Sequence, residues 1–111
     1  MAQAHAQSGE VVSLAPYGGR LAEFKTSAIL KAEQLELVRL VLPARRGLRE
    51  HRAPGGVTVL CLEGRIAFDT PAGQQLLGAG DLIHLRAGEP HALQALEDAS
   101  ALVTICLIKP N

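Results

Sequence analysis

Short apolar runs separated by turn residues fill the second half of this chain. From Gly47 onward, turn signals recur at spacings of about ten residues, and the runs between them are four to nine residues long. None of these runs reaches the length of about 11 residues that is typical of a helix. We therefore predict an all-β fold, a sandwich or a barrel. The predicted strands are Val57–Glu63, Arg65–Thr70, Gln74–Leu77, Leu82–Leu85, His91–Leu96 and Ser100–Ile108.

The segment Lys25–Leu42 allows two interpretations. It is rich in Ala, Leu, Lys, Glu and Gln, so local propensity alone predicts a helix. The alternation in Leu35-Glu36-Leu37 fits a strand equally well. If the rest of the chain is an antiparallel barrel, strands are the more economical interpretation, because a lone helix would leave sheet edges uncovered.

The length and composition indicate one globular domain. The chain has 111 residues, of which 48% are apolar, so it can bury roughly two thirds of its unfolded surface. Residues 1–9 are polar and rich in alanine, and we expect them to form a flexible tail. Residues 10–111 then form a single β-barrel domain.

Charge and composition narrow the function classes. The formal net charge is zero and aromatic residues make up 3% of the chain, which argues against direct binding of nucleic acid. No run approaches the roughly 18 apolar residues that span a membrane, and the N-terminus does not resemble a signal peptide. We therefore expect a soluble, cytoplasmic protein. Cys61 and Cys106 lack a metal-binding or redox spacing and are predicted to be buried thiols.

Two segments that contain turn residues resemble the motifs of a known family. The first, Gly47–Gly64, contains His51 and the turn Ala53-Pro54-Gly55-Gly56, and the second, Gly78–Leu93, ends in a Gly-Glu-Pro turn and His91. They resemble the two motifs of the cupin superfamily of small jelly-roll barrels (double-stranded β-helices). The chain is also similar to small stand-alone bacterial cupins with the sequence His-Arg/Lys-Ala-Pro-Gly. The resemblance covers about the last two thirds of the chain.

The first cupin motif is degenerate here. It reads Gly, five residues, His-x-His, three or four residues, Glu, six residues and Gly. Counted back from Gly64, the Glu position falls on Val57, the second His position on Ala53 and the first on His51.

The second motif keeps more of its pattern. It reads Gly, five residues, Pro-x-Gly, two residues, His, three residues and Asn. Gly80 opens it, Gly88 and His91 match, and Arg86 and Ala95 replace the Pro and the Asn.

The resemblance implies a metal centre, and this chain keeps half of its protein ligands. In metal-binding cupins the motif histidines and the Glu converge on Fe, Mn, Ni or Zn. This chain keeps His51 and His91, and catalytic zinc sites usually have three protein ligands. A third donor could come from His84, Cys61 or Glu50. His84 in an apolar strand is more often a satisfied core histidine, and Cys61 lies about 13 Å deeper than the vacant Glu position.

Arginines crowd around His51 in the sequence and add a further hypothesis. They are either a solvated loop or guanidinium groups at the barrel mouth that hold a small carboxylate by bidentate contacts. The arginines around His51 are Arg45, Arg46, Arg49 and Arg52, and Arg86 in the second motif stands where the family has Pro.

These observations predict a largely apolar ligand pocket at one end of the barrel. Our first hypothesis is a small-molecule-binding protein without a full metal centre. The rival is a divalent-metal enzyme (dioxygenase, isomerase or lyase) acting on a small carboxylate-bearing substrate. The predicted pocket residues are His51, His91, Val57, Val59, Cys61, Arg49 and Arg86, and the candidate metal ligands are His51, His91 and His84.

Two further expectations concern partners. The resemblance implies a homodimer, and the apolar N-terminal runs suggest the same weakly, through edge pairing. A third hypothesis is the ligand-binding half of a transcription regulator, but no helix-turn-helix segment is present, so DNA contact would need a partner chain. No Gly-x-Ser-x-Gly motif and no phosphate-binding loop before a helix occurs in the sequence.

Overall fold

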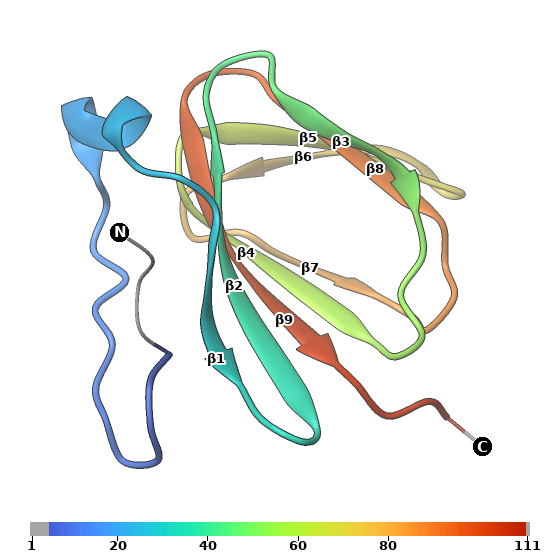
Figure 1. Ribbon diagram of the computed structural model, residues 1–111. Helices are drawn as coiled ribbons and strands as arrows, with labels where there is room; N and C mark the ends of the chain where they lie inside the picture. Colours follow the sequence, from blue (N-terminus) through green and yellow to red (C-terminus); the bar gives the residue numbers. More distant parts are fainter. Residues whose placement is uncertain (1–4, 111) are drawn as a thin grey trace.

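The chain folds into a barrel of two antiparallel sheets that face each other across one core (Figure 1). The computed structural model describes residues 5–110. Within them a short 3-10 helix, η1 (Gly18–Glu23), precedes the strands β1 (Ser27–Lys31), β2 (Leu35–Leu42), β3 (Gly47–His51), β4 (Val57–Glu63), β5 (Arg65–Thr70), β6 (Gly73–Gly78), β7 (Leu82–Leu85), β8 (His91–Ala95) and β9 (Ala99–Cys106). No helix in this range is long and apolar enough to cross a membrane.

One sheet has five strands in the order β1-β2-β9-β4-β7, and the other has four in the order β3-β8-β5-β6. From β3 to β9 every connection crosses from one sheet to the other except the β5–β6 hairpin, which stays within the four-stranded sheet. This arrangement confirms the predicted all-β jelly-roll barrel.

The turn residues place the strands where the sequence predicted them. The predicted runs Val57–Glu63 and Arg65–Thr70 are strands β4 and β5 from end to end. Gly64 joins them with φ of 79°, and a side chain there would lie 2.2 Å from the carbonyl oxygen of Asp98. Only glycine satisfies both the left-handed backbone and this close approach.

The helix that local propensity predicts for Lys25–Leu42 is wrong, and the strand interpretation is correct. The segment forms β1 and β2, and β2 pairs with β9 over eight consecutive positions, from Leu35–Cys106 to Leu42–Ala99. Long-range pairing and burial on both faces outweigh a propensity difference of well under 1 kcal/mol per residue.

Alternate residues of each strand fill the barrel core. On β4, Val57, Val59 and Cys61 point inward and expose 5%, 2% and 1% of their surface. They pack with inward residues of the other strands: Leu40, Leu42, Ile66, Phe68, Leu77, Leu85, Leu93, Ala95, Ala99 and Ala101.

The N-terminal segment runs along the outside of the barrel beside β1 (Figure 1). Ala6 donates its N–H to the carbonyl of Ile29 at 2.8 Å, and Leu21 of η1 is buried. Residues 1–4 of the predicted flexible tail lie outside the described residues. The flexibility of residues 5–9 stays a prediction.

Arg45 has an unusual backbone conformation for a non-glycine residue. It lies six positions before His51, where the first cupin motif has its opening Gly, and its φ is 73°. Its N–H donates to Ala95 O at 2.9 Å and its carbonyl accepts a bond from the Gln94 side chain at 3.2 Å, and these bonds hold the left-handed turn.

Candidate functional site

Two connections form one end of the barrel, which we call the mouth. The β3–β4 and β7–β8 connections lie side by side there (Figure 1). The N–H of Gly88 donates to Ala53 O at 2.8 Å, and the Arg52 guanidinium donates to Gly88 O at 3.4 Å. The loop sequences of the two motifs are therefore bonded to each other.

The two motif histidines meet at this mouth. His51 ends β3 and His91 begins β8, and the two are directly paired in the β3–β8 ladder. Their rings lie 4.2 Å apart between centroids in an edge-to-face arrangement with an interplanar angle of 64°. His91 is 4% exposed and lies above Phe68, whereas His51 is exposed to solvent. The pair thus connects the core to the surface.

The same local bond orients both imidazole rings. The Nδ1 atom of His51 lies 2.9 Å from the carbonyl oxygen of Arg49, and that of His91 lies 3.0 Å from the carbonyl of Glu89. A carbonyl only accepts, so Nδ1 must carry the proton in each neutral ring. Each Nε2 then has a free lone pair, and neither makes a hydrogen bond within residues 5–110.

The other two donor positions of the cupin motif are filled by apolar side chains at the same end of the barrel. Ala53 packs against the core and Val57 is buried within it. In the described part of the chain, no three His, Cys, Asp or Glu side chains gather into a group that could hold a metal ion. The donor set is therefore two imidazole nitrogens, which falls short of the three protein ligands usual for a catalytic metal.

The third donors considered from the sequence lie elsewhere. His84 pairs with Thr58 on β4, whose side chain alternates with the inward Val57, so His84 lies on the outer face of the sheet and is exposed. The expectation of a core histidine there is wrong. Cys61 is sealed in the core, and Glu50 is exposed on β3. Cys106 is exposed, contrary to the prediction of two buried thiols.

The structure separates the arginines into two groups. β3 runs from Gly47, paired with Gln94, to His51 at the mouth, so Arg45 and Arg46 lie at the far end of that strand. Arg49, Arg52 and Arg86 are at the mouth side, exposed, and without an ion-pair partner within residues 5–110. Arg86 also begins the turn that leads to His91, through a bond from Glu89 N–H to Arg86 O at 3.1 Å.

Of the predicted pocket residues, His51 and His91 lie together in the structure. Arg49 is close to His51 in the chain, and Arg86 is close to His91. Val57, Val59 and Cys61 lie below, inside the packed core. Burial raises the pKa of the Cys61 thiol, so it stays protonated at neutral pH.

The opposite end of β4 holds a polar cluster that the sequence analysis missed. The carboxylate of Glu63 accepts hydrogen bonds from the N–H groups of Tyr17 and Gly18, both at 3.0 Å, and from the Ser100 hydroxyl at 2.5 Å. Arg39 donates to the same carboxylate at 3.4 Å and to Ala15 O at 2.9 Å. We call these residues the Glu63 clip, because they fasten the N-terminal segment to the barrel.

The clip lowers the pKa of its carboxyl group. Burial alone would raise the pKa of Glu63, but the hydrogen bonds from Ser100, Tyr17 and Gly18 and the charge of Arg39 outweigh it and lower the pKa. Arg39 is 4% exposed and its guanidinium lies 3.8 Å from the centre of the Tyr17 ring. An arginine in the otherwise apolar outer stripe of β2 was the signal in the sequence for this cluster.

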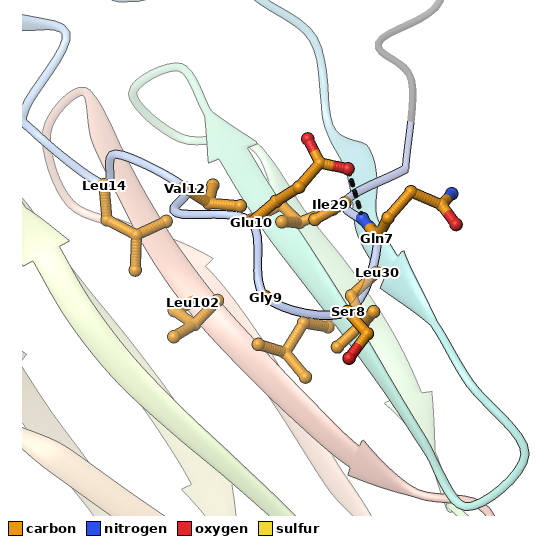
Figure 2. Close-up of a pocket in the computed structure, with 11 residues that line it drawn as sticks. Gln7, Ser8, Gly9, Glu10, Val12, Leu14, Ile29, Leu30 and Leu102 are labelled. Carbon is orange, nitrogen blue, oxygen red and sulfur yellow. Dashed lines mark hydrogen bonds between the residues drawn. The ribbon is translucent and has the colours of Figure 1, made fainter.

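A hollow of about 400 Å³ lies between the N-terminal segment and the five-stranded sheet (Figure 2). Val12 and Leu14 line it from the segment, and Ile29, Leu37 and Leu102 line it from the sheet. Leu102 is out of phase with the inward Ala101 and Val103 of β9, so this hollow is on the outer face. It does not communicate with the histidine pair through the sheet.

The fold and the site together define a class of protein: small jelly-roll barrels with a pair of histidines at the mouth. The family model of the cupin domain matches residues 38–108. The chain belongs to the cupin family. The comparison with curated protein sequences found no match.

Solved structures of other cupins have the same fold as this chain. A cupin superfamily protein from Desulfitobacterium hafniense superposes with a TM-score of 0.74 at 12% identity, covering 89% of this chain and 100% of the other. An RmlC-like cupin from Desulfovibrio desulfuricans gives 0.70 at 21% identity, covering 93% and 98%. Oxalate decarboxylase from Bacillus subtilis, a protein with Mn(II) centres, gives 0.63 at 25% identity and covers 68% of this chain and 22% of its own.

Proposed function

We propose that this cupin binds a small organic acid at the barrel mouth, with His51 and His91 as its central contacts. The observation that carries this proposal is the edge-to-face pair of rings with both Nδ1 atoms tied to backbone carbonyls. The tie leaves an Nε2 lone pair free on each of two rings whose centroids are 4.2 Å apart. Such a pair accepts hydrogen bonds, so the ligand needs a donor such as a hydroxyl group.

The charge at the mouth supports an acidic ligand. The exposed guanidinium groups of Arg49 and Arg86 carry no ion pair within residues 5–110, and guanidinium binds carboxylate by two parallel hydrogen bonds. A hydroxy acid offers both complements, a hydroxyl for the imidazoles and a carboxylate for the arginines. Val57 and Phe68 are buried in the core next to this end of the barrel.

The second candidate is metal-dependent chemistry on the same pair. Two imidazoles are half of the donor set of a metal-binding cupin, and the Mn(II) centres of oxalate decarboxylase supply a precedent in the fold. Ala53 and Val57 cannot donate, so this proposal needs further ligands from solvent or substrate. We therefore rank it second.

As an assembly we propose a homodimer.

A ligand titration tests the first candidate. Imidazole nitrogen signals are followed by NMR while glycolate or lactate is added to untagged protein. We expect saturable shifts at Nε2 of His51 and His91, which weaken when Arg49 or Arg86 is replaced by Ala. His84 is the internal control, because it is exposed on the outer face and should not shift. Equal shifts of all three histidines would contradict a specific site.

Metal content separates the two candidates. Untagged protein is dialysed against Fe(II), Mn(II), Ni(II) or Zn(II) and analysed for bound metal. We expect well under one equivalent for each metal. About one equivalent that disappears in His91→Ala would overturn the metal-free site and establish the second candidate.

A further inference from the structure

The N-terminal segment forms a roof over part of the outer face of the five-stranded sheet (Figure 2). It is fastened at two places. Ala6 donates to the carbonyl of Ile29 at 2.8 Å, and the Glu63 clip holds the N–H groups of Tyr17 and Gly18. In the described part of the chain, no backbone hydrogen bond joins residues 7–14 to the sheet. This span therefore rests on its side chains, and the hollow of about 400 Å³ lies beneath it.

Leucine side chains form most of the floor of this hollow. Leu30 and Leu37 are cross-strand partners on β1 and β2, and Leu102 is on the neighbouring β9. All three keep part of their surface exposed although they lie under the segment. Val12 and Leu14 line the hollow from the roof and are also half-buried. The described residues thus enclose an apolar space without filling it.

One end of the hollow is polar and acidic. Gln7 and Glu10 lie at this end, and Leu14 lies at the other (Figure 2). One oxygen of the Glu10 carboxylate accepts the N–H of Gln7 at 2.7 Å, and the Glu10 N–H donates to the Gln7 carbonyl at 3.0 Å. These two bonds fix the carboxylate at the rim, and its other oxygen has no hydrogen bond or ion pair among residues 5–110. No lysine, arginine or histidine is among the described residues that line the hollow, so its formal charge is negative.

We propose that this hollow is a second ligand site, which binds a short aliphatic chain carrying a primary ammonium group. The aliphatic chain fills the space between the leucines and the roof, and the ammonium group donates to the free oxygen of Glu10. An ammonium group has three donors and no acceptor, which suits a carboxylate. This site lies on the outer face of the sheet, apart from the histidine pair at the mouth, and it prefers the opposite charge.

The roof and the size of the hollow favour a small molecule over a segment of protein. A strand or helix of another chain, or of a second copy of this one, would have to displace the N-terminal segment that the Glu63 clip fastens. A small molecule needs only the space beneath it. The volume of about 400 Å³ lies within the range of roughly 300–1,000 Å³ that is usual for small-molecule sites.

NMR of the leucine and valine methyl groups tests the proposal on the full chain. The probes are n-hexylammonium, n-hexanol and n-hexanoate, which share one chain length and differ in the head group. Methyl signals of Leu30, Leu37 and Leu102 should shift saturably with hexylammonium, in the millimolar range for so small a probe. Hexanol should bind more weakly, and hexanoate more weakly still, because its carboxylate meets that of Glu10.

Two variants separate the contributions of charge and of space. Glu10→Gln keeps an oxygen for the Gln7 N–H and removes the charge, so it should weaken hexylammonium binding by about two- to fivefold and leave hexanol binding unchanged. Leu102→Phe overfills the hollow and should weaken the binding of all three probes by at least about fivefold. The matched control is Leu82→Phe, which changes an exposed leucine on β7, on the same outer face but outside the hollow, and should leave binding unchanged.

Three results would overturn the proposal. The first is the absence of any saturable shift at the three leucines. The second is an equal shift at Leu82, which would show that the probes only coat apolar surface. The third is hexanoate binding at least as tight as that of hexylammonium, or hexylammonium binding indifferent to Glu10→Gln. Glu10 is exposed, so this last comparison holds even if circular dichroism shows that Leu102→Phe fails to fold.

Discussion

The two ends of β4 use the same kinds of side chain in opposite ways. At the far end, the carboxylate of Glu63 is met by Arg39, Ser100 and two backbone N–H groups. At the mouth, His51 and His91 each satisfy one ring nitrogen and leave the other without a partner in the described residues. The Glu63 carboxylate has its partners within the chain, although Arg39 Nε beside it is buried without a hydrogen-bond partner in the described residues. Each histidine ring of the other cluster is bonded at one nitrogen only.

This difference separates the structural role of the Glu63 clip from the binding role that we propose for the histidine pair. A polar network with its partners in place fixes the position of the segments it joins, here the N-terminal segment against the barrel. Polar groups that are oriented but unpaired offer their hydrogen bonds to something from solution. Burial alone would not have made this distinction, because Arg39 and His91 are each 4% exposed.

The largest effect should follow from removing the cation of the clip. Arg39→Ala leaves the Glu63 carboxylate partly buried without its charge partner, and such changes cost about 3–5 kcal/mol. Urea unfolding followed by circular dichroism measures the loss. The matched control is Arg20→Ala, which breaks an ion pair with Glu23 whose side chains are 73% and 60% exposed and should cost at most about 1 kcal/mol. Equal losses in the two variants would show that the clip is no more than a surface pair.

The second-largest effect should come from low pH, which should lower the stability that the Glu63 clip contributes. The pKa of Glu63 is lowered in the folded state, so its contribution to stability is present above the ordinary value of 4.5 and is lost as the pH falls through the lower folded pKa. The free energy of unfolding should therefore decline below about pH 4.5. Glu63→Gln keeps the side-chain shape, lowers stability at neutral pH and should flatten this decline. An unchanged acid slope in that variant would show that other carboxylates cause it.

Periodicity and turn residues were enough to predict an all-β sandwich or barrel, and the motif resemblance narrowed this to a jelly-roll barrel. Gly64 and the Gly-Glu-Pro turn before His91 are turn signals that can be recognised locally, and the strands end where these residues place them. Lys25–Leu42 could not be decided locally, because its helix propensity competes with a pairing partner, β9, that lies more than fifty residues away in the chain.

Only those residues of the candidate site that the motif spacing identifies could be predicted from the sequence. The spacing gave His51 and His91, but the tie of each Nδ1 to the carbonyl two residues before it depends on ring orientation, which no sequence pattern specifies. Glu63 was predicted only as the last residue of the strand Val57–Glu63. Its role depends on Arg39 and Ser100, which reach it from β2 and β9, and on backbone N–H groups of the N-terminal segment.

The smallest effect on stability should come from the mouth. His51 is exposed, ends an edge strand and packs mainly against the ring of His91, so His51→Ala should change the free energy of unfolding by no more than about 0.5 kcal/mol. The same variant should abolish the saturable shift of His91 Nε2 with glycolate or lactate, because one of the two proposed acceptors is gone. Urea unfolding and the NMR titration on one sample measure both. A loss of stability comparable to that of Arg39→Ala, with the titration intact, would make the histidine pair a second clip and remove the contrast between the two ends of β4.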